Sequence, residues 1–466
     1  MKKPLIAAVA VVALAGIAVV GGAALTGAQA KKRLQAAPLA WQAQWPMIKV
    51  LEQHYDRGLF GATHTVTLQF GCEAANPGGA AAPLLLTLRQ RVQHGPLPGL
   101  AGIGAVAVDT EVLLPEAARK QLSALIGNQA PFSAHTLVGF DGASDTRFAM
   151  PQFKSTGPEG QQLAFQGITG SLRDRGGVLQ YEFSMPGFTL GVHDARMAME
   201  MRLAGARMHG ELGGGAMWAR PGKGEGDMAA MEMSVTPQDA SMPPLKLALH
   251  DLHFSSDNRL DKALLDGVAR FTAQGTVNDV KLDKIELQAS VKRLHAPSYE
   301  RLMQRLMDMS AATCDMKQAI SPQVMLAEMQ QDLVALLPYN PEYALDKLAV
   351  ESGGRRAELS YAVGMEGVTP EDAKLPLAAL LGGKAHFRGR ARLPLAWAQA
   401  AMLRFGANAQ GPADPAAQAD MAEVMLAKMT GDGFVVRDGD MLATEFSFEK
   451  GQMLVNGKPL GRPPAQ

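Results

Sequence analysis

The chain has 466 residues, of which 47% are hydrophobic and 19% are charged. This composition supplies a large buried core and is too apolar for a disordered chain. The 45 basic residues balance the 45 acidic residues, so no net charge attracts nucleic acid or an anionic membrane surface. The two cysteines, Cys72 and Cys314, could form one disulfide or could be small buried side chains, and the sequence leaves both possibilities open.

Residues 4–25 contain no charged side chain. At about 1.5 Å per residue they can form a helix of roughly 33 Å, which is enough to cross a bilayer core. We therefore expect an N-terminal membrane anchor or signal over residues 1–33. A cleaved signal peptide is the alternative, because two lysines precede the apolar run and Ala28-Gln29-Ala30 has the small-residue pattern of a cleavage site. Both interpretations export the rest of the chain.

Trp41 and Trp45 follow the basic residues that come after the apolar run. Indole rings are favoured at the boundary between membrane and water, which suits an anchored chain. Packing of both rings against the exported body is an equal alternative.

From residue 61 to about 295 the dominant pattern has a period of two, as a half-buried strand requires. In residues 63–70, for example, His64 and three apolar side chains alternate with threonines and a glutamine. Glycine-rich or proline-rich turns separate such runs at short intervals. This predicts a large antiparallel meander in a β-rich region, residues 34–295. The glycine-rich stretch 205–227 is expected to form a mobile hairpin tip.

After Pro297 the apolar residues recur at helical spacing, and Ser321 and Pro322 suit an N-cap and a first helical position. Strand-like runs return over residues 343–365. We expect residues 296–466 to form a mixed α/β C-terminal region packed on the same body. The expected fold class is therefore α+β: an N-terminal transmembrane helix, then a large, mostly antiparallel β-sheet with its helices concentrated in the C-terminal part.

Three motifs look functional but have simpler interpretations. Residues 102–107 match the string G-x-G-x-x-A, but the residues that follow read as a strand, whereas a dinucleotide site needs a helix there. His94-Gly95-Pro96 is more typical of a turn. His250 and His253 lie three apart on a predicted strand, so they face opposite sides and cannot share a metal ion without a bulge. We therefore expect no catalytic, cofactor-binding or metal-binding residue, no cofactor and no enzymatic activity.

Four features occur in order along nearly the whole chain. They are the N-terminal apolar run, Tyr55-Asp56-Arg57-Gly58-Leu59-Phe60, His94-Gly95-Pro96-Leu97-Pro98 and Gly451-Gln452-Met453-Leu454-Val455-Asn456-Gly457-Lys458-Pro459. Together they resemble the YdgA-like family of bacterial envelope proteins, whose function is unknown. The resemblance implies a single-pass protein of the bacterial inner membrane, with its body in the periplasm and a tendency to self-associate. It implies no known catalytic residues.

A long antiparallel sheet tends to curl, and a curled sheet with one apolar face can offer a groove. We therefore expect a tethered protein that binds an apolar ligand, such as a lipid, or an envelope protein on an extended β surface. The alternative is a homo-oligomeric structural or assembly factor of the cell envelope, and an envelope hydrolase is a third possibility. Because residues 178–185 and 285–294 lack the prolines that protect sheet edges, we also expect a homodimer that persists without residues 1–33.

Overall fold

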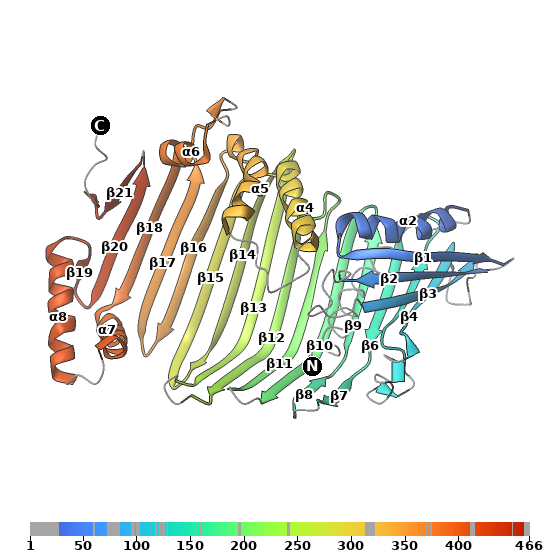
Figure 1. Cartoon of the computed structure of the whole chain (residues 1–466), viewed down its shortest axis with the longest axis horizontal. Coiled ribbons are helices and arrows are strands. Elements are labelled where there is room, and N and C mark those ends of the chain that lie inside the picture. The colour runs from blue at the N-terminus through green and yellow to red at the C-terminus, as the bar shows by residue number, and fades with distance from the viewer. Residues whose placement is uncertain are drawn as a thin grey trace. The chain divides into compact units, whose positions relative to one another are not determined.

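The computed structural model describes residues 28–58, 61–71, 84–94, 98, 103–116, 119–120, 123, 126–127, 129–157, 160–193, 197–239, 243–312, 322–369, 371–372, 375–410, 415–449 and 451–460. By their internal contacts the residues form two compact units. Unit 1 comprises residues 1–248 and 300–329, and unit 2 comprises residues 249–299 and 330–466. Both units are dominated by β-strands (Figure 1).

Unit 1 is built on an antiparallel sheet. Its strands are β1 (Ile48–Arg57), β2 (Gly61–Phe70), β3 (Leu84–His94), β4 (Val106–Leu113), β5 (Ser133–Val138), β6 (Ser144–Met150), β7 (Phe153–Thr156), β8 (Gln162–Phe165), β9 (Ile168–Arg175), β10 (Val178–His193), β11 (Met197–Leu212) and β12 (Gly222–Pro237). Strands β1 to β6 pair in chain order, β6 pairs with β9, and β9 to β12 again pair in chain order. Strand β8 pairs with the second part of β10, and β7 pairs with β8.

The alternation in β2 shows why these residues form strands. His64, Val66 and Leu68 are buried, whereas the intervening Thr65 and Thr67 are only half-buried. A strand with this pattern buries one face and leaves the other to solvent, as the period of two predicts. The expected strand is confirmed.

Helix α2 (Ala28–Gln44) packs on the first strands of unit 1 (Figure 1). The buried Trp41 on this helix joins a core cluster with Ile48, Leu68 and Phe132. Beyond the helix, Trp45 packs edge-on against Trp218, with ring centroids 5.5 Å apart. Of the two interpretations of the tryptophans, the structure favours packing on the body.

The expected hairpin tip lies within residues 205–227, but it is shorter than the sequence predicted. Strand β11 runs to Leu212 and β12 begins at Gly222, so only residues 213–221 form the turn. Within that turn Ala219 is buried. Glycines occur here because the strands approach closely: a Cβ on Gly210 would come within 2.6 Å of the Tyr181 hydroxyl oxygen. At Gly210, the lack of a side chain therefore permits tight packing between neighbouring strands.

Unit 2 is also an antiparallel sheet. Its elements are β13 (Leu245–Asp261, which begins in unit 1), β14 (Leu264–Val277), β15 (Val280–His295), η2 (Leu337–Tyr339), β16 (Glu342–Ser352), β17 (Arg355–Met365), α6 (Leu377–Lys384), β18 (Ala385–Pro394), α7 (Leu395–Gln410), α8 (Pro415–Gly431), β19 (Val436–Asp438), β20 (Met441–Glu449), β21 (Gln452–Val455) and β22 (Lys458–Pro459). Helices α4 (Ala296–Ala312) and α5 (Pro322–Val334) contribute residues to both units.

Strands β14 to β18 pair in chain order, β20 pairs with β18, and β21 and β22 follow. The short β19 also pairs with β20. Apart from α2, the described helices α4 to α8 follow residue 295. A large antiparallel β-sheet with few helices, most of them C-terminal, is therefore confirmed.

The proposed anchor, residues 4–25, lies outside the described residues, and so do Cys72 and Cys314. Among the helices that the structure describes, none combines the length and the apolar character needed to span a bilayer. The expected N-terminal transmembrane helix is thus not supported by the structure.

Candidate functional site

One face of the unit 2 sheet carries a continuous row of apolar side chains. The row is Tyr343, Val363, Phe387, Phe448 and Met453, each directly opposite the next across β16, β17, β18, β20 and β21. Residues directly opposite each other in antiparallel strands share one face of the sheet. This row therefore forms one apolar stripe across five strands.

A second row lies beside the first on the same face. It consists of Leu345, Tyr361, Gly389, Phe446 and Val455. Aromatic rings connect the two rows, with centroid distances of 6.5 Å from Tyr343 to Tyr361, 5.9 Å from Tyr361 to Phe387 and 5.2 Å from Phe387 to Phe446. We call these two rows the aromatic face.

The aromatic face is partly open to solvent. Tyr343 is 47% exposed, Val363 is 41% exposed and Met453 is 37% exposed. Helices instead cover the ends of the strands: Leu380 of α6 packs near Met365, and Leu426 of α8 packs near Leu442. Exposed apolar side chains that lie in a continuous row mark a surface suited to an apolar partner.

Gly389 lets an aromatic ring lie flat on this face. A Cβ at Gly389 would overlap the Phe446 ring, so the ring occupies the space that any other side chain would take. A ring that packs over glycine in this way restores the apolar contact that glycine itself cannot make.

The opposite face of unit 2 is charged. Glu286 on β15 accepts ion pairs from Lys284 at 2.8 Å, Lys347 at 2.7 Å and Arg356 at 3.0 Å. Hydrogen bonds from Lys284 and Lys347 lower the pKa of Glu286 to about 2. The sheet is therefore amphipathic, with a network of ion pairs on one side and the aromatic face on the other.

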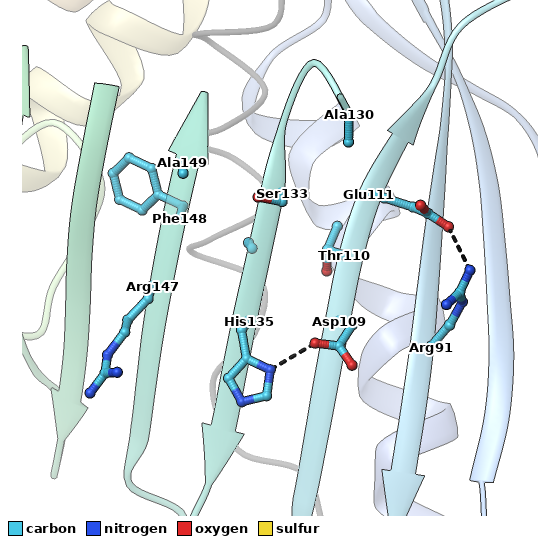
Figure 2. Close-up of a pocket in the computed structure, with 11 residues that line it drawn as sticks. Arg91, Asp109, Thr110, Glu111, Ala130, Ser133, His135, Arg147, Phe148 and Ala149 are labelled. Atoms are coloured by element: carbon cyan, nitrogen blue, oxygen red, sulfur yellow. Dashed lines mark hydrogen bonds and ion pairs between the residues drawn. The ribbon is translucent and has the colours of Figure 1, made fainter. Parts of the chain in front are cut away.

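Unit 1 contains a hollow of about 400 Å³ on its solvent-facing surface, between β3 and β6 (Figure 2). Small side chains form its floor, because Ser133 lies directly opposite Ala149. Longer side chains surround them. These are Arg91, Glu111, His135 and Arg147, and Asp109 lies between Arg91 and His135 across the sheet. We call this cavity the polar hollow.

Most charges in the polar hollow are paired within it. The Glu111 carboxylate lies 3.3 Å from Nη2 of Arg91 and 3.4 Å from Nε of Arg89. Nδ1 of His135 lies 2.7 Å from Oδ1 of Asp109 (Figure 2). Arg147 is held less closely, since its Nε is 3.9 Å from the Asp145 carboxylate.

The motifs singled out in the sequence do not assemble into a site. Strand β4 begins at Val106, so a strand and not a helix follows the glycine-rich string, as expected. His94 ends β3, and residues 95–97 lie outside the described residues. Around His250 and His253, Asp251 adopts a φ of 52° and its carboxylate accepts a hydrogen bond from Gln274. Within the described residues no group of three or more His, Cys, Asp or Glu side chains could hold a metal ion.

Sequence reasoning nominated no site residue and missed the polar hollow. The available signal was the charge on alternate positions of several short strands, such as Asp109 and Glu111 on β4. That signal is weak, because alternating charges on a strand usually mark a solvated face. Only the pairing of β3 to β6 brings these side chains together.

The family described as "Bacterial protein of unknown function (DUF945)" matches residues 1–462. The chain belongs to this DUF945 family. Neither a comparison with curated proteins nor one with solved structures found a match. The family is a bacterial family of unknown function, which agrees with the expected class of protein and leaves the YdgA-like name itself unconfirmed.

Proposed function

We propose that this DUF945 protein is a membrane-tethered periplasmic protein that binds an apolar ligand, the acyl chain of a lipid, on the aromatic face of unit 2. The observation that carries the proposal is the partial exposure of Tyr343, Val363 and Met453 in one continuous row. The resemblance to envelope proteins and the apolar run at residues 4–25 support the tether and the export of the body.

The dimensions of the face suit an extended chain. Five strands at a spacing of about 4.8 Å give a row of about 19 Å from the first strand to the fifth. A flexible hydrocarbon laid along this row would bury apolar surface at roughly 25 cal/mol per Å². Aromatic rings favour such contacts because they offer large, rigid apolar surfaces.

We propose no catalytic role for the chain. The Ser298 hydroxyl lies 2.8 Å from Nδ1 of His295, an arrangement that resembles part of a hydrolase triad. Ser298 is buried at the start of α4, however, and its hydroxyl also donates to the carbonyl oxygen of Ala335. A buried hydroxyl cannot reach a substrate, so this pair is better explained as a fixed start for the helix.

Native mass spectrometry of the full-length, detergent-extracted protein tests the proposal. The wild-type protein should retain lipid, and the double variant Tyr343→Ser/Val363→Ser should lose most of it. Arg390→Ser is the matched control, because Arg390 lies on β18 and pairs with Glu445 on the charged face. Lipid that is absent from the wild type, or retained equally by both variants, contradicts the proposal.

A homo-oligomeric assembly factor is the alternative function, supported by the fact that an open sheet has edges. The expectation that residues 178–185 and 285–294 form open edges is wrong, because they lie in β10 and β15, which are paired on both sides. Among the described strands of unit 1, β1 pairs with β2 alone, and it carries charged residues and a register shift between Val50 and Glu52, which protect an edge. In the same mass spectra, an oligomer free of lipid would favour this alternative.

Export is tested separately. A reporter that is active only outside the cytoplasm, fused after Gln466, should be active. Membrane-fraction peptides that include residues before Ala30 would indicate a retained anchor. Chains that begin at Lys31 and occur only in the soluble periplasm would indicate a cleaved signal peptide.

A further inference from the structure

We propose that helix α2 lies along the surface of the membrane that residues 4–25 cross, with Leu39 in the headgroup region and Lys31 and Lys32 beside lipid phosphates. This contact rests on the proposed tether and adds a second, peripheral contact between the protein and the bilayer. It is separate from the aromatic face, because α2 belongs to unit 1.

The position of α2 in the chain brings its start close to the bilayer. Only residues 26 and 27 separate the apolar run from Ala28, where α2 begins. Two residues span at most about 7 Å. A chain that crosses the bilayer with residues 4–25 therefore holds the first turn of α2 next to the headgroups. Because α2 has 17 residues and is about 25 Å long, its direction decides whether Leu39 also reaches them.

The outer surface of α2 has the chemistry of a bilayer contact. Residues 34–48 contain no charged side chain. Leu34 and Trp41 are buried against unit 1, whereas Leu39 is 57% exposed, and the other exposed residues of this part of α2 are alanines and glutamines. A helix that faces water ordinarily carries charged side chains on its outer face. An uncharged outer face with a large apolar side chain suits a helix that lies in the headgroup region of a bilayer.

The charges at the start of α2 are all basic. Lys31 and Lys32 are exposed, and no acidic residue precedes Glu52 in the sequence. The ammonium nitrogen of Lys31 lies 5.8 Å from the centroid of the Tyr55 ring, a contact that leaves its charge unneutralised. Basic side chains next to a bilayer are attracted to lipid phosphates. The end of α2 that adjoins the apolar run is therefore also the end that favours the headgroups.

The acidic residues of the neighbouring strand β1 do not cancel this charge. Glu52 and Asp56 lie directly opposite Thr67 and Thr63 on β2. These threonines alternate with Val66, which belongs to the core cluster that α2 covers. Successive side chains of a strand point to opposite faces of the sheet. Both carboxylates therefore point to the face of the sheet away from α2.

Helix α2 is fixed to unit 1, so a membrane contact along it would also orient that unit. The backbone N–H of Val50 donates to Oε1 of Gln42 at 2.9 Å. Near the end of α2, the amide of Gln304 on α4 donates to the carbonyl oxygen of Ala43 and to Asp308, each at 3.1 Å. This carboxylate lies beside the end of α2 that is remote from Lys31 and Lys32.

Photo-crosslinking of the full-length protein in vesicles of phosphatidylcholine and phosphatidylglycerol tests the contact. The photoreactive residue p-benzoylphenylalanine replaces Leu39 in one variant and Leu85 in the matched control. Leu85 is 40% exposed and adjoins Leu86, which belongs to the core cluster that α2 covers, so Leu85 points away from α2. We expect at least fivefold more lipid adduct at position 39 than at position 85, measured by mass spectrometry.

A charge reversal tests the basic end of α2. In the variant that carries the photoreactive residue at position 39, Lys32→Glu should lower the yield of lipid adduct at least twofold. Lys154→Glu changes an exposed lysine on β7 and is the matched control. It should leave the yield unchanged.

Three results would overturn the contact: equal adduct yields at positions 39 and 85, equal yields in Lys32→Glu and Lys154→Glu, or a covalent dimer in place of lipid adducts at position 39. The dimer would mean that a second copy of the chain covers α2. Alkaline carbonate extraction of the same vesicles separates this contact from the tether. Protein that stays in the vesicles without adducts at position 39 retains the tether and overturns the contact along α2, whereas protein that is extracted overturns both.

Discussion

Nδ1 of His64 on β2 lies 2.8 Å from Oε1 of Gln90 on β3, on the buried side of unit 1. The amide of Gln90 in turn donates to Thr110 on β4 at 3.3 Å. This polar chain crosses three strands inside an otherwise apolar region, and His64 is only 1% exposed. Among the described residues, Nε2 of His64 finds no hydrogen-bond partner. A second proton on this ring would therefore be poorly accommodated.

The stability of the protein should fall at mildly acidic pH because of His64. Burial lowers the pKa of His64 in the folded chain, and its hydrogen bond to Gln90 opposes this only in part. The His64 side chain therefore binds a proton more readily in the unfolded chain than in the folded one. Its contribution to the free energy of unfolding is complete above a pH of about 6.5, and it declines as the pH falls towards the pKa of His64 in the folded chain. The thermal midpoint of His64→Gln should decrease less between pH 7.5 and 5.5 than that of the wild type. His193→Gln, which changes an exposed histidine, should behave as the wild type; an unchanged pH dependence in His64→Gln would refute the assignment.

Glu286 should stabilise unit 2 except at strongly acidic pH. Its pKa is lowered to about 2 by hydrogen bonds from Lys284 and Lys347. A carboxyl group whose pKa is lower in the folded chain stabilises the fold at pH values above its pKa in the unfolded chain. This stabilisation is lost as the pH falls towards its pKa in the folded chain. Glu286→Gln should lower the thermal midpoint at pH 7 and flatten its decline between pH 5 and 3. Glu445→Gln, at an exposed pair with Arg390, should change neither; equal effects of the two substitutions would contradict this account.

The turn between β11 and β12 should depend on Glu300. The Glu300 carboxylate accepts hydrogen bonds from the backbone N–H groups of Met217 at 3.1 Å and Trp218 at 2.8 Å. Hydrogen bonds to a charged acceptor are worth about 1.5–3 kcal/mol. Glu300→Ala should therefore speed hydrogen–deuterium exchange in residues 213–221, whereas Glu225→Ala on β12 should leave this exchange unchanged. Slow exchange in the Glu300 variant would show that the turn is held by packing alone.

A methyl group at Gly389 should disrupt the aromatic face. Its Cβ would overlap the Phe446 ring, which must then move away from the sheet. Forcing extra volume into a packed site costs typically 1–3 kcal/mol. Gly389→Ala should lower the thermal midpoint and the amount of lipid retained in native mass spectra. Gly383→Ala on α6, whose Cβ would meet nothing within 4 Å, is the control; equal lipid retention would mean that Phe446 does not help to bind the ligand.

Self-association should be tested on a shorter deletion than the sequence suggested. Removing residues 1–33 would cut into α2, which begins at Ala28 and buries Leu34 against unit 1. Deletion of residues 1–27 keeps this helix intact. A homodimer held by the body should persist in this variant during sedimentation at micromolar concentration. A strictly monomeric species would exclude dimerisation through the body and leave dimerisation through residues 4–25 as the remaining route.

The residue pattern by itself determined that this chain forms antiparallel strands and which side chains point the same way. In β2 the alternation of His64, Val66 and Leu68 with threonines sets the buried face, because the side-chain period of a strand is a local property. The helical spacing after Pro297 was equally readable, and it corresponds to α4. The balanced charge and the lack of familiar catalytic motifs are likewise properties of the sequence alone.

Only the tertiary structure decided which strands are neighbours, and the site depends on that. Arg147 and His135 adjoin because β5 pairs with β6, and Phe446 covers Gly389 because β20 returns beside β18. Strand pairing depends on contacts between residues that can be far apart in the chain. A local sequence pattern encodes neither the entropic cost of closing the loop between them nor the register of the pairing. For the same reason the glycines at 205–227 read as a loose loop. Gly210 instead permits close packing against Tyr181, which lies far away in the sequence and only one strand away in the sheet.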